Sequence, residues 1–271
     1  MNLYHKPGLF SFAVLGIMGL LLSGCSFVSR APADTLVPIP FSSVPVPALT
    51  PPAPSPIVDS IDTSAKPVII PTQNAGSNVA LPTSFLLGVP FTPQAPTANW
   101  DVVHEETCEE ASLLMVNAFY HGKPVGRLPA AEVEQELLSL VDAQKNMFGY
   151  FEDTTVSETI DLAQEFYGLQ ARVLEEPTRE DIKRELLLKH PVILPAAGKL
   201  LHNPNFKGEG PLYHMIVIRG FTRDSFITND PGTKKGDGYT YTYTTLMEAM
   251  HDWDSHDILK GAKRAFVLLP P

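Results

Sequence analysis

The uneven distribution of proline is the feature that most limits what this chain can fold into. Eleven of its 26 prolines fall between residues 26 and 80, many in runs such as Val-Pro-Val-Pro and Pro-Pro-Ala-Pro. Proline fixes φ and has no backbone N–H, so such a stretch favours extended polyproline II segments. Because it also has few charges and no helical period, residues 26–80 are predicted to form a disordered, semi-stiff tether. The alternative is a binding site for small domains that recognise proline runs.

The segment before this tether is predicted to be an export signal. A short polar start with His5 and Lys6 precedes a mostly apolar run over residues 8–22. This run is shorter than the roughly 20 residues that a membrane-spanning helix needs, and it ends in small residues. Its last residues, Leu22-Ser23-Gly24-Cys25, resemble the lipobox of bacterial lipoproteins. The resemblance implies cleavage before Cys25, a diacylglycerol on its thiol, and a domain outside the cytoplasm on the outer or cytoplasmic membrane. The alternative is ordinary secretory cleavage beside an incidental cysteine.

From residue 81 onward the composition is that of a globular domain. The charges of residues 1–80 cancel, so the formal net charge of −10 belongs to residues 81–271. This length is normal for one domain, and no internal repeat is present. The acidic balance argues against nucleic acid as a partner, because phosphate binding depends on Lys and Arg. Two cysteines make no disulfide framework and show no zinc-finger spacing. We expect a monomer, and no metal or organic cofactor is implied.

The pattern of the domain predicts helices first and strands second. Thr107 and Glu110 have capping-box spacing, which puts Cys108 in the first turn of a helix that ends near Tyr120. Its buried stripe would include Leu114, Met115 and Ala118. Further helices are expected over residues 129–144 (with Pro129 at the first helical position), 155–168 and 178–190, and a short one over 246–253. Strands are expected over residues 191–196, 213–221, 225–229, 239–244 and 265–269, with a hairpin turn over 222–225. This order indicates an α+β fold.

Cys108 is the candidate nucleophile. If Cys25 carries lipid, Cys108 is the only free thiol of the mature protein. A helix N-terminus stabilises a thiolate and lowers its pKa. The alternative is that Cys108 is simply a small buried apolar residue. Four nearby carboxylates would oppose the thiolate and make a cationic partner more necessary: Glu105, Glu106, Glu109 and Glu110.

His214 is the candidate cationic partner of Cys108, and Asp230 is the candidate carboxylate that orients the His214 ring. In a hairpin centred near residues 222–223, two residues face each other when their numbers add to about 445. The numbers of His214 and Asp230 add to 444. Both side chains should therefore emerge at the same end of adjacent strands, where a carboxylate can orient an imidazole. Asn229 could do the same as a fallback. The alternative is a satisfied sheet histidine beside a turn over residues 229–232.

Other polar residues have weaker patterns. His104 lies four residues before Cys108, but no carboxylate is obviously placed to orient it. The loop residues His202, Asn203 and Asn205 are expected to be solvated or to rim a cleft. The acidic-histidine run over residues 251–257 is interpreted as a solvated helix end rather than a zinc site.

Four motifs in one order carry a family resemblance. They are VPFTPQ at residues 89–94, CEEAS at 108–112, YHMIV at 213–217 and NDPG at 229–232. The series resembles the papain-like cysteine peptidases related to bacteriocin-processing, double-glycine leader peptidases, over about residues 85–269. The resemblance implies a papain-like fold in which N-terminal helices pack on a C-terminal antiparallel sheet.

The same resemblance implies roles for individual residues. Cys108 would be the nucleophile, His214 the general base and acid, and Asp230 the orienting residue. Gln94 would donate to the oxyanion, where one donor is typically worth about 3 kcal/mol. Trp100, Tyr213 and Asn229 would help to bind a peptide or protein substrate; Trp100 is otherwise a packing residue.

The expected activity is hydrolysis of peptides or proteins at the cell surface. Leader cleavage coupled to export is not expected, because the chain shows no transmembrane bundle and no GxxxxGK[ST] loop. Two alternatives stay open. One is a catalytically silent peptide-binding module of the same fold, and the other is a cell-wall amidase or transpeptidase.

Overall fold

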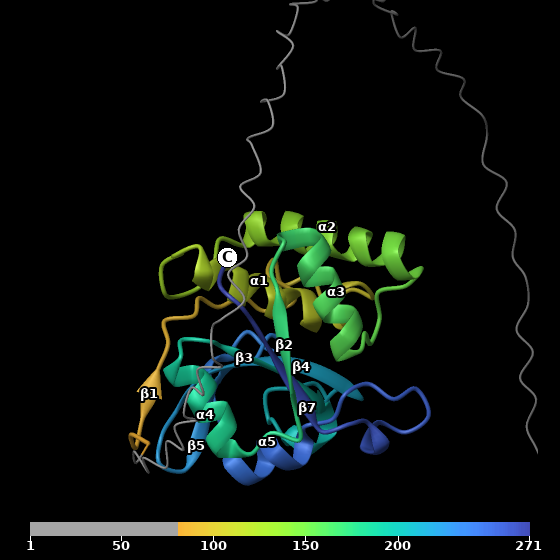
Figure 1. Cartoon of the computed structure of the whole chain (residues 1–271). Helices are drawn as coiled ribbons and strands as arrows, with labels where there is room; N and C mark the ends of the chain where they lie inside the picture. The colour runs from red at the N-terminus through yellow and green to blue at the C-terminus, as the bar shows by residue number, and fades with distance from the viewer. Residues whose placement is uncertain (1–80) are drawn as a thin grey trace, which may run out of the picture. The chain divides into compact units, whose positions relative to one another are not determined.

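The computed structural model describes residues 81–271 (Figure 1). The predicted export signal, the lipid attachment at Cys25 and the proline-rich tether lie outside the described residues. Within residues 81–271, no helix is long and apolar enough to cross a membrane.

Residues 81–271 form five α-helices, and four of them were predicted at nearly their observed positions. Their bounds are α1 Cys108–Tyr120, α2 Ala130–Phe148, α3 Val156–Tyr167, α4 Arg179–Leu187 and α5 Tyr243–Ala249. Thr155 and Thr178 cap α3 and α4, each through a reciprocal capping box. Pro129 is the N-cap of α2 rather than its first residue, and its backbone is extended. Helix α5 begins three residues earlier than predicted, because Thr242 caps it by accepting a hydrogen bond from the backbone N–H of Thr245.

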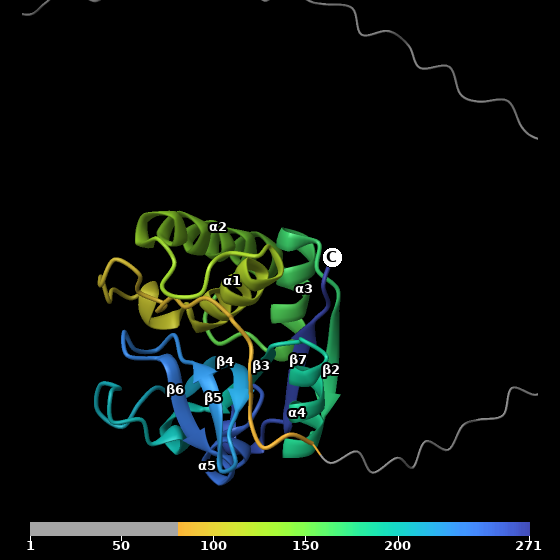
Figure 2. The same ribbon diagram turned by 90° about the vertical axis from the view of Figure 1, so that its left-hand side faces the viewer.

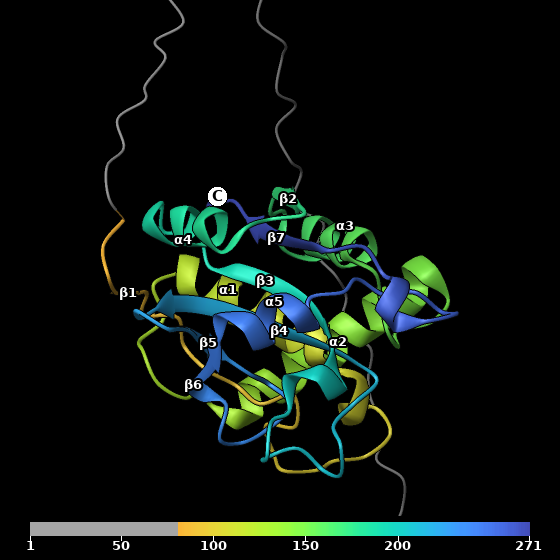
Figure 3. The same ribbon diagram turned by 90° about the horizontal axis from the view of Figure 1, so that it is seen from below.

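The strands form one antiparallel sheet. Their bounds are β1 Phe85–Leu86, β2 Ala171–Glu175, β3 Val192–Ala197, β4 Tyr213–Phe221, β5 Ser225–Asn229, β6 Asp237–Thr242 and β7 Arg264–Leu268. Their order is β2-β7-β3-β4-β5-β6, with β1 paired to β4. Strand β4 lies in the middle, and all of its residues are buried. Figure 3 shows β3, β4 and β5 running side by side.

The structure confirms the predicted α+β arrangement. Helices α1, α2 and α3 lie above the sheet, and α4 and α5 lie below it (Figures 1 and 2). The N-terminal helices thus pack on a mainly C-terminal antiparallel sheet, as expected for a papain-like domain. Helix α1 lies against β4, and a small apolar cluster joins it to α2. The first turn of α1 is therefore enclosed by protein on several sides.

The β4–β5 hairpin has the predicted turn but a shifted register. Thr222 N donates to Ser225 O at 2.8 Å, which closes the turn. The pairing then slips between Ile218 and Gly220, so that Val217 faces Asn229. A slip of this kind is typical of a β-bulge, which the sequence did not indicate. The end of the hairpin still brings β4 and the residue after β5 together.

Candidate active site

His214 and Asp230 meet at the end of this hairpin. The imidazole Nε2 lies 2.8 Å from Asp230 Oδ1, and both side chains are buried. Asp230 is the first residue after β5, and the predicted meeting of the two side chains is confirmed. Burial opposes ionisation of the Asp230 carboxyl. The charge of His214 and the hydrogen bonds that the carboxylate accepts outweigh burial and lower the pKa of Asp230. The pair therefore has a carboxylate that fixes the imidazole through Nε2 and leaves Nδ1 for other chemistry.

The surroundings of His214 keep its ring in one place. The Phe206 ring stands edge-on to the imidazole, with centroids 5.3 Å apart. On another side, a Cβ at Gly232 would lie 2.8 Å from the His214 Cε1 atom. Any larger residue at position 232 would displace the ring. Asn229, the fallback orienting residue, points elsewhere: its Nδ2 donates to the carbonyl of Pro90 at 2.9 Å.

Cys108 begins α1, as predicted, but the local capping differs. Thr107 makes no side-chain cap; its hydroxyl donates to the carbonyl of Gln94 at 3.0 Å. The predicted capping box between Thr107 and Glu110 is therefore wrong, because Glu110 turns into the core instead. Ser112, one turn further on, donates to the carbonyl of Met215 at 3.3 Å. This contact sets the start of α1 against the residue that follows His214.

The thiol of Cys108 is buried, in surroundings that favour its protonated form. Its Sγ lies 3.0 Å from Glu109 Oε2, to which it donates, and it also contacts the backbone of Met215. Burial, followed by the charge of Glu109, raises the pKa of Cys108 well above its usual value. The expected lowering by the helix N-terminus is thus wrong here, because desolvation and the adjacent carboxylates outweigh the helix dipole. Within the part of the chain that the structure describes, no hydrogen bond joins this thiol to His214.

Two buried acids flank the thiol. Glu109 Oε1 accepts from the backbone of Thr154 at 3.1 Å, and burial raises the pKa of Glu109 to about 8. Glu110 accepts from the amide of Gln144 on α2, and burial followed by the Glu109 charge raises the pKa of Glu110 strongly. Glu110 Oε2 and Gln144 Oε1 are both buried without a hydrogen-bond partner. A proton on Glu110 would supply the missing donor, so we assign Glu110 as a neutral acid.

Gln94 lies beside the start of α1 but is engaged in the preceding loop. Its Nε2 donates to the carbonyls of His104 and Glu105, at 2.8 and 2.9 Å. Its backbone N–H donates to Pro231 O at 2.9 Å, which ties the loop to the turn after Asp230. Its Oε1 is buried without a partner. Donation to an oxyanion would require this amide to turn, and that role stays a prediction.

His104 has two carboxylate partners that sequence reasoning missed. Its Nδ1 lies 2.8 Å from Asp101 Oδ1, and its Nε2 lies 3.0 Å from Glu134 Oε1 on α2. Hydrogen bonds from the backbone and ring of His104 lower the pKa of Asp101 to about 2. The spacing of Asp101, three residues before His104, is the signal that could have found this pair. The hydrogen bond to Asp101 and the proximity of Glu134 together place His104 between its loop and α2.

The predicted binding residues differ in exposure. Trp100 is 42% exposed, on the loop before α1. Tyr213 is buried, and its hydroxyl donates to Thr154 O at 3.0 Å; Asn229 is fully buried. Their roles in substrate binding stay predictions, with Trp100 alone open to solvent.

The acidic-histidine run at residues 251–257 is only partly solvated, contrary to expectation. His251 and Asp252 are buried. Asp252 Oδ1 accepts from the backbone of Val156, the first residue of α3, at 2.8 Å. Among residues 81–271, no group of three or more His, Cys, Asp or Glu side chains is arranged to hold a metal ion.

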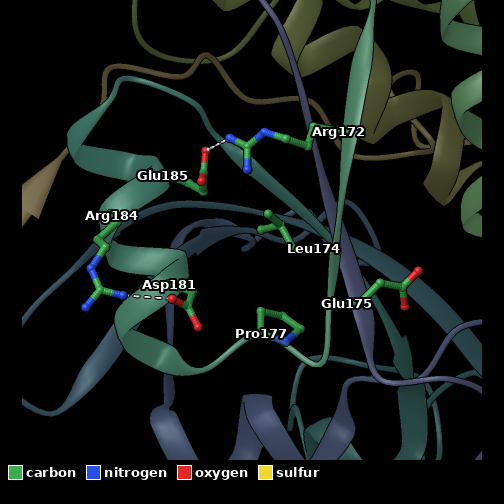
Figure 4. Close-up of a pocket in the computed structure, with 7 residues that line it drawn as sticks. All are labelled: Arg172, Leu174, Glu175, Pro177, Asp181, Arg184 and Glu185. Carbon is green, nitrogen blue, oxygen red and sulfur yellow. Dashed lines mark hydrogen bonds and ion pairs between the residues drawn. The ribbon is translucent and has the colours of Figure 1, made fainter. Parts of the chain in front are cut away.

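A pocket of about 280 Å³ lies away from these residues, between β2 and α4 (Figure 4). Arg172 pairs there with Glu185 at 2.6 Å, and Arg184 pairs with Asp181 at 2.7 Å. None of the residues predicted to act in catalysis lines it. The arginines are matched by carboxylates, so the pocket offers no net positive charge to an anionic ligand.

Comparison with known proteins identifies the family. Residues 86–257 match the model of the Peptidase_C39 like family, and the chain belongs to this family. Several solved structures are similar, among them two peptidase structures. A C39-like peptidase from Bacillus anthracis is 15% identical, with a TM-score of 0.46, covering 69% of this chain and 98% of that one. The peptidase domain of Streptococcus ComA, a bifunctional ABC transporter in a quorum-sensing pathway, is 16% identical, with a TM-score of 0.40, covering 68% and 99%. A search of curated proteins gave no match.

Proposed function

We propose that the chain is a cysteine peptidase of the bacterial cell envelope, with Cys108 as nucleophile and His214 and Asp230 completing the triad. Membership of a C39-like peptidase family supports the class of reaction. The observation that carries the assignment of residues is the buried His214–Asp230 pair beside the residue that contacts the Cys108 thiol. Catalytic triads are recognised by the geometry and roles of their residues rather than by sequence position, and this pair supports two of the three roles.

In the proposed reaction, the proton of Cys108 passes to Nδ1 of His214, and the sulfur attacks the scissile carbonyl. The Cys108 backbone amide and the side chain of Gln94 stabilise the oxyanion. His214 then gives its proton to the leaving amine, and water, deprotonated by the same ring, releases the acid from the acyl-enzyme. Asp230 keeps Nε2 protonated throughout, which leaves Nδ1 as the nitrogen that exchanges the proton.

The described arrangement corresponds to a resting state in this proposal. The thiol donates to Glu109, and the Gln94 amide donates to two carbonyls. A rotation about the Cα–Cβ bond of Cys108 would turn the sulfur from Glu109 toward His214. Transfer of the thiol proton to an imidazole held by Asp230 then gives the ion pair that the reaction needs.

The anchoring part of the proposal rests on the N-terminal sequence. A lipid on Cys25 would hold the domain at a membrane, and residues 26–80 would set its reach. The substrate would then be a peptide or protein outside the cytoplasm. Radiolabelled fatty acid incorporated by the wild type but not by a Cys25→Ala variant would support this part, and equal labelling would contradict it.

A silent peptide-binding module is the second candidate, and two contacts favour it. Glu109 and burial hold the thiol in its protonated form. The Gln94 amide has both of its hydrogens engaged away from a substrate oxygen. Either feature would suppress turnover while leaving the fold intact.

A peptide library separates these candidates. The full-length chain should release defined fragments, detected by mass spectrometry, and Cys108→Ala should release none while melting at the same temperature. Peptides that bind the wild type without cleavage would favour the silent module. Release of fragments from peptidoglycan but not from peptides would favour the amidase or transpeptidase.

A further inference from the structure

Asp230 accepts more hydrogen bonds than the imidazole alone provides. Its Oδ1 accepts from His214 and from the backbone N–H of Gly232, at 2.8 and 3.0 Å. Its Oδ2 accepts from the Tyr241 hydroxyl at 2.5 Å and from Asn203 Nδ2 at 3.0 Å. The two oxygens therefore have separate sets of partners. The hydrogen bonds to Oδ2 hold the carboxylate in the orientation in which Oδ1 faces His214.

The two partners of Oδ2 come from distant parts of the chain and also bind each other. Tyr241 lies on β6, and Asn203 lies in the loop between β3 and β4. Asn203 Nδ2 donates to the Tyr241 hydroxyl at 2.8 Å, which leaves the phenol proton for Asp230. Both side chains are buried, at 3% and 5% exposure. This closed triangle leaves the carboxylate no freedom to rotate.

We propose that Tyr241 and Asn203 are positioning residues of the triad, which hold Asp230 so that Oδ1 orients His214 for proton transfer. This inference rests on the proposed peptidase function. A buried carboxylate whose Oδ2 lost its donors would be destabilised as an anion, and it would rotate or take up a proton. In either state it would hold the imidazole less well, although neither residue touches the substrate.

Two features support Tyr241 as a permanent donor. Burial, followed by the Asp230 charge, raises the pKa of Tyr241 far above its usual range, so the phenol keeps its proton. The Tyr239 ring packs against the Tyr241 ring, with centroids 4.8 Å apart. Tyr239 has no hydroxyl hydrogen bond to Asp230 among the contacts of residues 81–271, so it offers a matched control.

The kinetic test compares Tyr241→Phe with Tyr239→Phe in the full-length chain. Tyr241→Phe removes one donor and should lower kcat for a cleaved peptide by roughly tenfold, with KM nearly unchanged. Tyr239→Phe should behave as the wild type. In an Asp230→Asn background, Tyr241→Phe should have no further effect on kcat, because the two residues act through one group. Equal kcat for wild type and Tyr241→Phe, or an undiminished effect in the Asp230→Asn background, would overturn the proposal.

A second readout does not depend on turnover. In protein labelled with carbon-13 at the Asp carboxyl carbon, the Asp230 signal is assigned by its loss in Asp230→Asn. Its pKa should rise in Tyr241→Phe and in Asn203→Ala, and not in Tyr239→Phe. An unchanged Asp230 pKa overturns the positioning roles whether or not peptides are hydrolysed. If the Asp230 pKa rises in these two variants but the wild type cleaves no peptide, the hydrogen-bond network is retained and the proposed peptidase function is contradicted.

Discussion

At the scale of single residues, the chemistry of the site depends on the competition between a helix N-terminus and a buried carboxylate. The dipole of α1 and its free N–H groups favour a Cys108 thiolate by about 1 kcal/mol. Burial without a cation costs more than this, and Glu109 adds a negative charge and an acceptor for the thiol proton. In the proposed reaction, proton transfer from Cys108 to His214 is therefore the step that the site must make favourable.

Removal of the Glu109 charge should make the thiol more acidic. Glu109→Gln keeps the size of the side chain and its contact with the Thr154 backbone, but it removes the carboxylate. We expect the pH midpoint of iodoacetamide labelling at Cys108 to fall, and the rate at pH 8 to rise roughly tenfold. Glu105→Gln, which changes a partly exposed carboxylate with no contact to the thiol among the described residues, is the control. A midpoint that does not move in Glu109→Gln would show that burial alone sets the pKa.

At the scale of elements, α3 is held at its start by two devices. Thr155 forms a reciprocal capping box with Glu158, and Asp252 accepts from the backbone of Val156. The first is local in sequence, and the second comes from the other end of the domain. Together they satisfy N–H groups that a helix start otherwise leaves without partners.

The capping box gives a stability prediction. Thr155→Ala removes the acceptor for the Glu158 N–H and should lower the free energy of unfolding by about 1 kcal/mol. Ser157→Ala alters an exposed hydroxyl in the same turn and should change it by less than about 0.5 kcal/mol. Urea unfolding of both variants checks this. Equal losses would mean that the cap contributes nothing beyond the general effect of an alanine.

Elements with local signals could be predicted from the sequence, and contacts between elements could not. Thr155 and Thr178 each precede an acid three residues later, which marks a helix start. Strand β2 was missed because its edge position leaves it mostly exposed, without alternation. His214 and Asp230 were found because a hairpin relates their positions, whereas Asn203 and Tyr241 reach Asp230 only through tertiary packing. The hydrogen-bond partner of the Thr107 hydroxyl is likewise set by tertiary packing, because it is the carbonyl of Gln94, 13 residues away.

At the scale of the whole molecule, the buried acids make stability depend on pH. The pKa values of Glu109 and Glu110 are raised in the folded state, so folded protein binds more protons than unfolded protein above the ordinary glutamate pKa of 4.5. Their contribution to the free energy of unfolding is complete below pH 4.5. It is lost as the pH rises through the pKa values that the two acids have in the folded protein. Asp230, whose pKa is lowered, contributes the opposite trend only in more acidic solution.

The free energy of unfolding should therefore fall between pH 5 and 8. Glu110→Gln should weaken this fall and raise stability at pH 8, on the order of 2 kcal/mol, because a neutral amide supplies the donor that Gln144 Oε1 lacks. Glu165→Gln, at an exposed position on α3, should leave the slope unchanged. Urea unfolding at several pH values measures both. A wild-type stability that is flat or rises across this range would contradict the raised pKa values of Glu109 and Glu110 in the folded protein.

The most direct measurement of the proposed triad is the burst released by an activated ester of a cleaved peptide. With a 4-nitrophenyl ester, acylation should outpace hydrolysis, so the full-length chain should release close to one nitrophenolate per Cys108 before steady turnover. Mass spectrometry of peptides from the quenched, digested protein should place the acyl group on Cys108, and Cys108→Ala and His214→Ala should show neither burst nor adduct. A wild type without burst or adduct, or an adduct on another residue, would contradict Cys108 as the nucleophile.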